Sequence, residues 1–231
     1  MKKRLLILPF IAMLSAPAMA GSSQPGKIVE LFTSQGCSSC PPANSLVNEI
    51  SGYADVLALT YSVTYWDYLG WTDTFGKREF TKRQKAYGEA FDEMNIYTPQ
   101  IILNGSEHSP RYKTSDLQDL SQDSAMPGLT LLERDGRLCV EGAFEAEAEY
   151  NLHLVEYVPG PQSVKVNRGE NRGRVLTLSN VVTNVTKLGP WDMRDPEFDT
   201  DIIPQKGTAY ALLLHDVDSH QIHAAVKYTK D

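Results

Sequence analysis

The sequence lacks a run of Lys and Arg, an internal repeat and any long apolar stretch after its first residues. Its 231 residues include 22 Lys and Arg against 29 Asp and Glu, so the formal net charge is -7. An acidic surface repels phosphate backbones, and this argues against nucleic acid as a partner. Hydrophobic residues nevertheless make up 42 % of the chain, a share typical of folded soluble proteins rather than disordered ones.

The N-terminus carries the features of a signal peptide. Residues 2–4 are positively charged, Leu5–Leu14 is an apolar stretch, and Ala18-Met19-Ala20 is a small-x-small cleavage site. The stretch is shorter than the roughly 20 residues of a membrane-spanning helix, so we expect residues 1–20 to be removed. The mature protein is then expected to be periplasmic or secreted, without membrane insertion. Export places its cysteines where disulfides form and persist.

A strand, a loop, a helix and a second strand are predicted next. Lys27–Thr33 is β-branched and aromatic, Ala43–Ile50 has apolar residues at helical spacing, and Asp55–Tyr65 again predicts a strand. The first turn of this βαβ unit carries Cys37-Ser38-Ser39-Cys40. The pattern indicates a mixed α/β segment with the cysteines at a helix start.

The remaining segments change character near Ser124–Gly128. Before that point we predict a charged helix between Phe75 and Met94, a strand at Gln100–Leu103 closed by the hairpin turn Asn104-Gly105, and a short helix at Thr114–Gln122. After it, turns separate six predicted strands: Leu129–Glu133, Leu138–Val140, Asn151–Val158, Val175–Val185, Ala209–His215 and Ile222–Tyr228. Short strands without an evident helix are typical of an all-β sandwich or meander.

Cys37 and Cys40 are better placed for redox chemistry than for stabilisation. A disulfide that closes so short a loop contributes on the order of 2 kcal/mol, whereas one from either residue to Cys139 would contribute roughly 4 to 5. Unpaired N–H groups and the helix dipole at a helix start favour a thiolate over a thiol. The pair is therefore interpreted as a redox switch.

The order of the motif suggests a role for each residue. The two prolines that follow Cys40 have no N–H, so the amides of Ser39 and Cys40, with the hydroxyl of Ser38 or Ser39, are left to stabilise a thiolate on Cys37. We assign Cys37 as the nucleophile and Cys40 as the resolving thiol, which would release a mixed disulfide formed at Cys37. This mechanism requires the sulfur of Cys37 to be reachable by another molecule.

Three other interpretations of the cysteines stay open. Either residue could pair with Cys139, because sequence does not determine connectivity. Two thiolates alone do not fill a tetrahedral zinc site, so we predict no metal and no cofactor, although copper(I) accepts two soft ligands and makes a copper-binding protein the alternative function. The third interpretation is a non-catalytic interaction module with an idle disulfide.

The order of motifs resembles the thioredoxin superfamily. A strand, a Cys-x-x-Cys at a helix start and a Thr-Pro before a further strand carry this resemblance. The wider chain is similar to a family of exported bacterial thioredoxin-like proteins known as a domain of unknown function, through the stretches Glu30–Pro42, Tyr65–Trp71, Tyr97–Gln100, Arg168–Asn171 and Leu188–Trp191. The resemblance implies a thioredoxin-like α/β domain over residues 21–125, followed by an all-β domain over residues 126–231.

The resemblance also implies an activity and a substrate site. Pro99 would be the cis proline that faces the cysteines, and the backbone of Thr98 would bind the substrate chain. The expected activity is that of a thiol–disulfide oxidoreductase or redox protein whose partners are protein or peptide thiols and disulfides. Ser62 and Thr64 stand where the family often has His and Asp, so proton transfer would fall to water or another side chain.

Aromatic residues are crowded after the second predicted strand, at Tyr65, Trp66, Tyr68 and Trp71. Aromatic surfaces bind extended peptides well, and Trp66 is our candidate for contacting a substrate beside the cysteines. The alternative is that these side chains belong to the hydrophobic core.

Three further groups have two interpretations each. Glu30 is either a buried carboxylate near the site or a solvent-facing residue. His215, His220 and His223 with Asp216 and Asp218 are potential metal ligands, but Asp216–Ser219 predicts a hairpin turn. The loop that contains Arg168, Arg172 and Arg174 either binds an anion or forms an internal ion pair with Glu170.

Overall fold

The computed structural model describes residues 22–93, 95–118, 129–142, 149–191, 195–217 and 219–230. The predicted signal peptide over residues 1–20 and the predicted boundary near Ser124–Gly128 lie outside the described residues. None of the described helices is long and apolar enough to cross a membrane.

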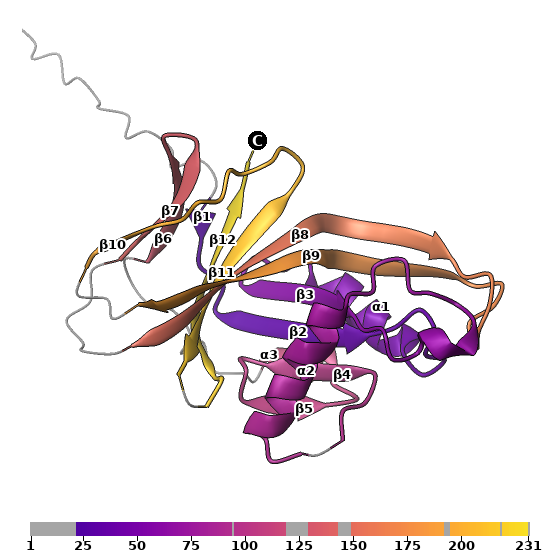
Figure 1. Ribbon diagram of the computed structural model, residues 1–231. Coiled ribbons are helices and arrows are strands. Elements are labelled where there is room, and N and C mark those ends of the chain that lie inside the picture. Colours follow the sequence, from indigo (N-terminus) through magenta and orange to yellow (C-terminus); the bar gives the residue numbers. More distant parts are fainter. Residues whose placement is uncertain are drawn as a thin grey trace, which may run out of the picture.

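The first half of the chain forms four adjacent strands of a mixed sheet (Figure 1). β2 (Lys27–Thr33) pairs in parallel with β3 (Val56–Ser62) and antiparallel with β4 (Gln100–Leu103). β5 (Glu107–Ser109) pairs antiparallel with β4 through the turn at Asn104 and Gly105, both of which have positive φ. The strands over 27–33 and 100–103 and the hairpin turn are therefore confirmed.

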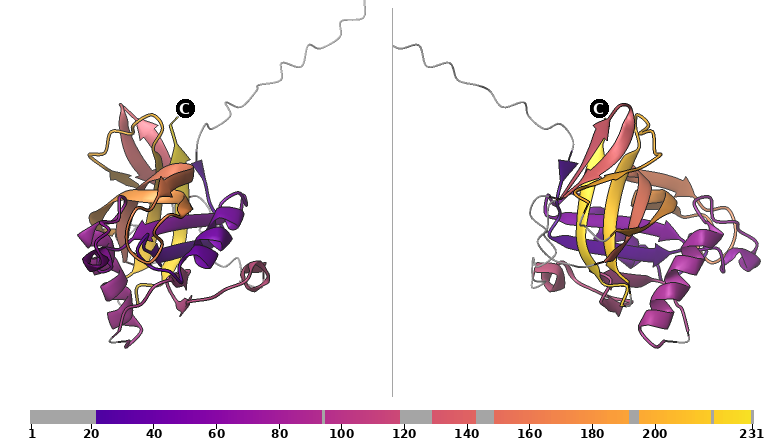
Figure 2. Two further views of the ribbon diagram at one scale, coloured as in Figure 1. Left: turned by 90° about the vertical axis from the view of Figure 1, so that its right-hand side faces the viewer. Right: turned by 60° about the vertical axis from the view of Figure 1, so that its left-hand side comes forward.

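Helices cover both faces of these strands, as Figure 2 shows. α1 (Pro41–Ile50) starts with two prolines and packs Ala43, Val47 and Ile50 on one face, where α3 (Thr114–Gln118) also lies. α2 (Arg78–Ala90) packs Phe80 and Tyr87 on the opposite face. The one-turn helix η1 (Asp67–Leu69) lies between β3 and α2 in the chain.

The second half is β-structure, as expected. β8 (Tyr150–Lys165) and β9 (Val175–Trp191) form a long antiparallel hairpin, and β11 (Ala209–Asp216) and β12 (Ile222–Thr229) continue the sheet from β8. β1 (Ser22–Ser23) pairs with β12 at the edge. A second sheet has three strands: β6 (Thr130–Arg134), β7 (Arg137–Glu141) and β10 (Glu197–Asp199).

The expected division into a thioredoxin-like α/β domain and a separate all-β domain is wrong. One nine-stranded mixed sheet, in the order β1-β12-β11-β8-β9-β3-β2-β4-β5, runs through both halves of the chain. β9 meets β3 in parallel at Thr60 and Val181, and the Thr60 hydroxyl donates to the carbonyl of Ser179 at 2.7 Å. Sequence periodicity shows where strands form but not which strand edges meet, so this junction could not be predicted.

The hydrophobic core is continuous across that junction. Beneath α2, Ile28 and Phe32 of β2 share one cluster with Val155 of β8 and Leu213 of β11. A second cluster lies between the nine-stranded and three-stranded sheets and includes Leu152, Trp191 and Leu131. The two halves therefore bury their apolar surface against each other.

Candidate functional site

Cys37 and Cys40 form a disulfide immediately before α1, with their Cα atoms 5.5 Å apart. The amide of Cys37 donates to the carbonyl of Ser34 at 3.1 Å, and that of Cys40 donates to the carbonyl of Cys37 at 3.3 Å. The chain thus turns twice between β2 and α1. Cys139 is a buried free thiol on β7, so the alternative pairings with Cys139 are not formed.

The predicted site residues lie around this disulfide. The Thr98–Pro99 peptide bond before β4 is cis, as the resemblance implies. The hydroxyl of Ser39 lies 3.3 Å from the sulfur of Cys37 and donates to the carbonyl oxygen of Thr98 at 3.5 Å. The indole N–H of Trp66 donates to the Thr98 hydroxyl at 2.7 Å. Residues far apart in the sequence therefore meet beside one sulfur atom.

Neither cysteine is exposed. Cys37 and Cys40 are both 0 % exposed, whereas Ser38 and Ser39 between them face solvent. A cavity of about 500 Å³ lies alongside, lined by Ser39, Pro42, Ala43, Thr98, Pro99, Pro110 and Arg111. Thr98 and Pro99 line this cavity, whereas the sulfur of Cys37, which the sequence interpretation requires to be reachable, is buried.

The tip of the β8–β9 hairpin (residues 166–174) lies against the disulfide loop (Figure 1). Asn171 is 0 % exposed, and its side-chain amide donates to the carbonyls of Gln35 at 3.0 Å and Cys37 at 2.7 Å. The Asn171 side-chain oxygen accepts from Arg174 at 3.1 Å. Every hydrogen-bonding position of this buried amide nitrogen is used, so the tip is fixed to the loop.

Glu170 of the hairpin tip accepts a hydrogen bond from the amide of Ser38 at 3.1 Å. Hydrogen bonds from the Ser38 side chain and backbone lower the pKa of the Glu170 carboxyl. The predicted ion pair between Glu170 and its neighbouring arginines is not formed among the described residues. The charges of this loop are evident in the sequence, but its position at the cysteines is not, because nothing local indicates what a hairpin tip contacts.

Asp73 is a second carboxylate at the loop, and no pattern in the sequence indicates it. It is 3 % exposed and accepts hydrogen bonds from the amides of Gln35 at 2.7 Å and Phe75 at 2.9 Å. Burial raises the pKa of Asp73, although both hydrogen bonds oppose that shift. Gln35 also accepts from the Trp71 indole at 2.9 Å, so the segment that precedes Cys37 is held through both its backbone and a side chain.

Comparison with known families identifies a relationship that spans both halves of the chain. The family described as "Protein of unknown function (DUF1223)" matches residues 28–214. The chain belongs to the DUF1223 family. The match runs from β2 into β11 and therefore includes the disulfide loop, Pro99 and the hairpin tip.

A solved structure has the same fold as this DUF1223 chain. The crystal structure of a protein from Agrobacterium tumefaciens is similar with a TM-score of 0.72 and 26 % identity, over 90 % of this chain and 96 % of that one. HBP35 of Porphyromonas gingivalis gives a TM-score of 0.48 and 14 % identity, over 90 % of this chain and 76 % of that one. The comparison with curated proteins found no match.

The aromatic group of this DUF1223 chain is divided between core and surface. Tyr65 and Trp66 are partly buried and pack against the cluster beneath α2. Trp71 packs against apolar side chains of the β8–β9 hairpin, including Val166 and Leu176. Tyr68 is 79 % exposed. Both interpretations therefore apply, and Trp66 is the member that contacts Thr98.

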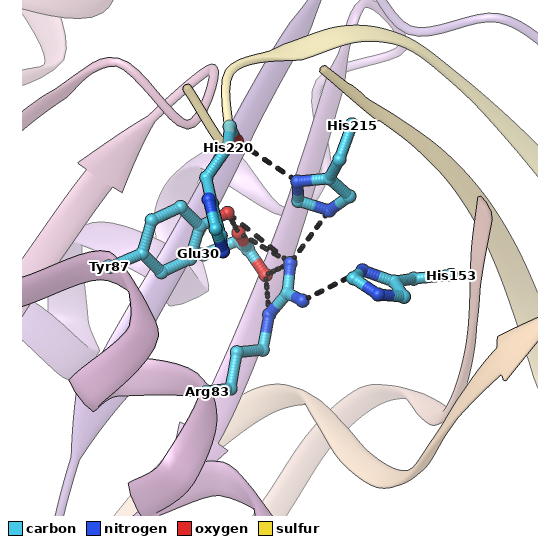
Figure 3. A network of polar contacts seen from close by, with 6 residues as sticks. All are labelled: Glu30, Arg83, Tyr87, His153, His215 and His220. Carbon is cyan, nitrogen blue, oxygen red and sulfur yellow. Dashed lines mark hydrogen bonds and ion pairs between the residues drawn. The ribbon is translucent and has the colours of Figure 1, made fainter. Parts of the chain in front are cut away.

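Glu30 is buried in a polar network beneath α2 (Figure 3). The guanidinium of Arg83 donates to both carboxylate oxygens of Glu30, at 2.9 and 3.1 Å, and the Tyr87 hydroxyl donates to the same carboxylate. Burial, the largest single cause, would raise the pKa of Glu30, but the charge of Arg83 and the hydrogen bonds from Arg83 and Tyr87 together outweigh it, so the pKa lies below its ordinary value. Glu30 is thus the buried carboxylate of one interpretation, but it belongs to this network rather than to the disulfide loop.

Two histidines complete the network in Figure 3. Arg83 donates to His153 at 3.3 Å and to His215 at 3.0 Å. Because these ring nitrogens accept from a cation, the Nδ1 of His215 carries the proton and donates to the carbonyl of His220 at 3.0 Å. The hairpin turn predicted at Asp216–Ser219 lies between the paired residues His215 and Ile222, although Asp218 itself lies outside the described residues. Within the described ranges, no three His, Cys, Asp or Glu residues are grouped to hold a metal ion.

Proposed function

We propose that this protein is a thiol–disulfide oxidoreductase, or a redox protein with that chemistry, acting through Cys37 and Cys40. The observation that carries the proposal is the disulfide at the start of α1 with Thr98 and Pro99 across Ser39. A disulfide between residues so close in sequence contributes on the order of 2 kcal/mol to stability, so stabilisation alone gives little reason for it. Exchange chemistry gives a reason for both the cysteines and their surroundings.

The proposed exchange starts from the reduced protein. The thiolate of Cys37 attacks a substrate disulfide and forms a mixed disulfide, and one substrate sulfur leaves as a thiolate that takes up a proton. The thiol of Cys40 loses its proton and attacks the sulfur of Cys37, which restores the protein disulfide and releases the second substrate thiol. The substrate gains two electrons and the protein dithiol loses two. Ser39, whose hydroxyl lies 3.3 Å from the Cys37 sulfur, is the donor best placed to stabilise the thiolate, with Ser38 beside it.

The cavity beside Ser39 is proposed to hold the substrate chain. Its prolines and Ala43 offer apolar contacts, and Thr98 and Pro99 line it next to the disulfide. Trp66 supports Thr98 through the indole hydrogen bond. This local arrangement is similar to the site of the thioredoxin superfamily, which supports protein or peptide thiols and disulfides as the partners. Because Cys37 is 0 % exposed, exchange includes a local displacement of Ser38 and Ser39.

The proposed place of action is the cell envelope or the exterior. The charged start, the apolar stretch and the Ala18-Met19-Ala20 site support export. In an oxidising compartment the disulfide persists, so a second dithiol must reduce the pair before each turnover.

We predict that Cys37→Ser abolishes disulfide exchange. Residues 21–231 would be assayed for reduction of insulin with dithiothreitol as the electron source, and by mass for the protein–glutathione adduct. Loss of the nucleophilic sulfur removes turnover, whereas Cys40→Ser retains Cys37 and accumulates a mixed disulfide. Cys139→Ser is the matched control, because Cys139 is buried on β7 and its thiol pKa is raised to about 11, chiefly by burial. Equal rates for the unaltered protein, Cys37→Ser and the uncatalysed reaction would refute the proposed function.

A further inference from the structure

The hairpin tip brings a negative charge to the backbone that surrounds Cys37. Glu170 is exposed, yet its carboxylate accepts from the amide of Ser38, the residue next to the nucleophile. The two residues are 132 positions apart in the sequence. Asn171 anchors the tip beside it by two hydrogen bonds to the loop carbonyls. The position of Glu170 is therefore set by a fully buried neighbour rather than by its own flexible side chain.

Most backbone amides near Cys37 donate hydrogen bonds to acceptors other than its sulfur. Ser38 donates to Glu170, and Cys40 donates to the carbonyl of Cys37. Pro41 and Pro42 have no N–H to offer. At other helix starts such amides stabilise a cysteine thiolate, and this stabilisation makes a disulfide easier to reduce. Here the hydroxyl of Ser39 lies 3.3 Å from the sulfur, but its single proton is shared with the carbonyl of Thr98.

The hairpin tip itself carries the cations Arg168, Arg172 and Arg174, none of which forms an ion pair with Glu170 among the described residues. The Asp73 carboxylate accepts a hydrogen bond from the amide of Gln35, and Arg174 donates a hydrogen bond to the side-chain oxygen of Asn171. Arg111 lines the cavity beyond Ser39. The hydrogen bonds from Ser38 lower the pKa of the Glu170 carboxyl and so favour the ionised carboxylate. A thiolate formed on Cys37 would therefore meet a like charge, which raises the pKa of a thiol.

We propose that Glu170 is a positioning residue that holds the amide of Ser38, opposes a thiolate on Cys37 and so favours the disulfide, making the reduced protein an electron donor. This inference rests on the proposed function, to which it assigns a direction. The protein dithiol gives two electrons and two protons to a disulfide of its partner, which becomes two thiols. A second dithiol then returns the protein to its reduced state and is itself oxidised to a disulfide.

The test is Glu170→Gln, which removes the charge but keeps an oxygen to accept from Ser38. Thiolate absorbance of the reduced protein against pH should show the Cys37 pKa lowered by about half to one unit, as expected for removal of a carboxylate charge that contacts the residue next to Cys37. Glu156→Gln on the same hairpin is the matched control, because the Glu156 carboxylate contacts Asn184 far from the tip. It should leave the titration unchanged. The raised pKa of Cys139, about 11, separates its titration from that of Cys37.

Equilibration with reduced and oxidised glutathione supplies the second readout. Above the Cys37 pKa, Glu170→Gln should shift the equilibrium about three- to tenfold toward the dithiol, the factor that corresponds to the pKa shift. Well below the Cys37 pKa, Glu170→Gln and the unaltered protein should have the same equilibrium constant with glutathione. A merely structural role of Glu170 would not give this pH dependence. Identical behaviour of Glu170→Gln and Glu156→Gln at all pH values would overturn the assignment. A shifted titration in a protein that fails to reduce insulin would leave the effect of Glu170 on Cys37 standing, but would refute the proposed function and with it the direction of electron transfer.

Discussion

At the residue scale, Arg83 shows how a charged side chain is accommodated inside this protein. β2 alternates its side chains between two faces, so Glu30 shares the α2 face with Ile28 and Phe32. A carboxylate there is costly unless it is paired and hydrogen-bonded. The guanidinium of Arg83 supplies the opposite charge and N–H groups that donate to the carboxylate. Its remaining N–H groups donate to His153 and His215. The two rings serve as acceptors and must therefore stay neutral.

We predict that stability falls as pH decreases below about 6.5. Burial, with the charge of Arg83, lowers the pKa of His153 to about 2 from 6.5 and places that of His215 well below the same value. Below 6.5 the unfolded chain binds protons at these rings and the folded chain does not, so the free energy of unfolding falls with decreasing pH, by up to about 1.4 kcal/mol per pH unit for each ring. Urea unfolding between pH 8 and pH 5 measures this slope.

The variant His153→Gln provides the control for that slope. It retains an oxygen to accept from Arg83 but removes one ring that titrates on unfolding. The pH dependence between 6.5 and 5 should therefore decrease by about one proton. A slope that is unchanged in this variant would show that other groups cause the acid sensitivity.

At the element scale, the β4–β5 turn connects two distant parts of the nine-stranded sheet. The amide of Asn104 donates to the carbonyl of Ile28 at 2.9 Å, and its own carbonyl accepts from Ile222 at 2.8 Å. A Cβ on Gly105 would lie 2.5 Å from the carbonyl oxygen of His220. The hairpin signal in the sequence thus coincides with a close backbone approach to the β11–β12 turn, which local pattern did not indicate.

We predict that Gly105→Ala destabilises the protein by about 2 kcal/mol or more, because alanine is strained at positive φ and its Cβ would meet backbone atoms. Gly136→Ala in the β6–β7 turn is a matched control: Gly136 also has positive φ, but nothing lies within 4 Å of the Cβ position. It should lose only the conformational part, about 1 to 2 kcal/mol. Urea unfolding of both variants measures the difference, and equal losses would argue against the close approach.

At the scale of the whole molecule, the shared sheet and core join the chain into one structural unit. β9 joins the first half at β3, and the cluster beneath α2 takes side chains from both halves. The hairpin tip adds the contacts of Asn171 with the disulfide loop. Removing either half would expose a strand edge and an apolar face to water.

We therefore predict a single unfolding transition for the oxidised protein. In a Trp66→Phe, Trp71→Phe variant, the fluorescence of Trp191 reports on the cluster between the two sheets, while far-UV circular dichroism reports on the whole chain. The two signals should share one midpoint in urea, because the halves cannot unfold separately without opening the common core. Two separate midpoints would indicate independent units.

The sequence by itself determined the local features of this protein. Apolar runs and turn residues placed β2, β4 and the β4–β5 turn, and the prolines at the start of α1 placed the cysteines at a helix start. These features depend on neighbouring residues, whose preferences can be read directly from the chain.

Only the tertiary structure decided what surrounds those features. The pairing of β3 with β9, the ion pair of Glu30 with Arg83 and the contacts of Glu170 and Asn171 with the disulfide loop all join residues far apart in the sequence. The physical reason is that such contacts depend on which strand edges and faces meet when the whole core is buried. Periodicity within a segment describes its own faces but carries no information about their partners.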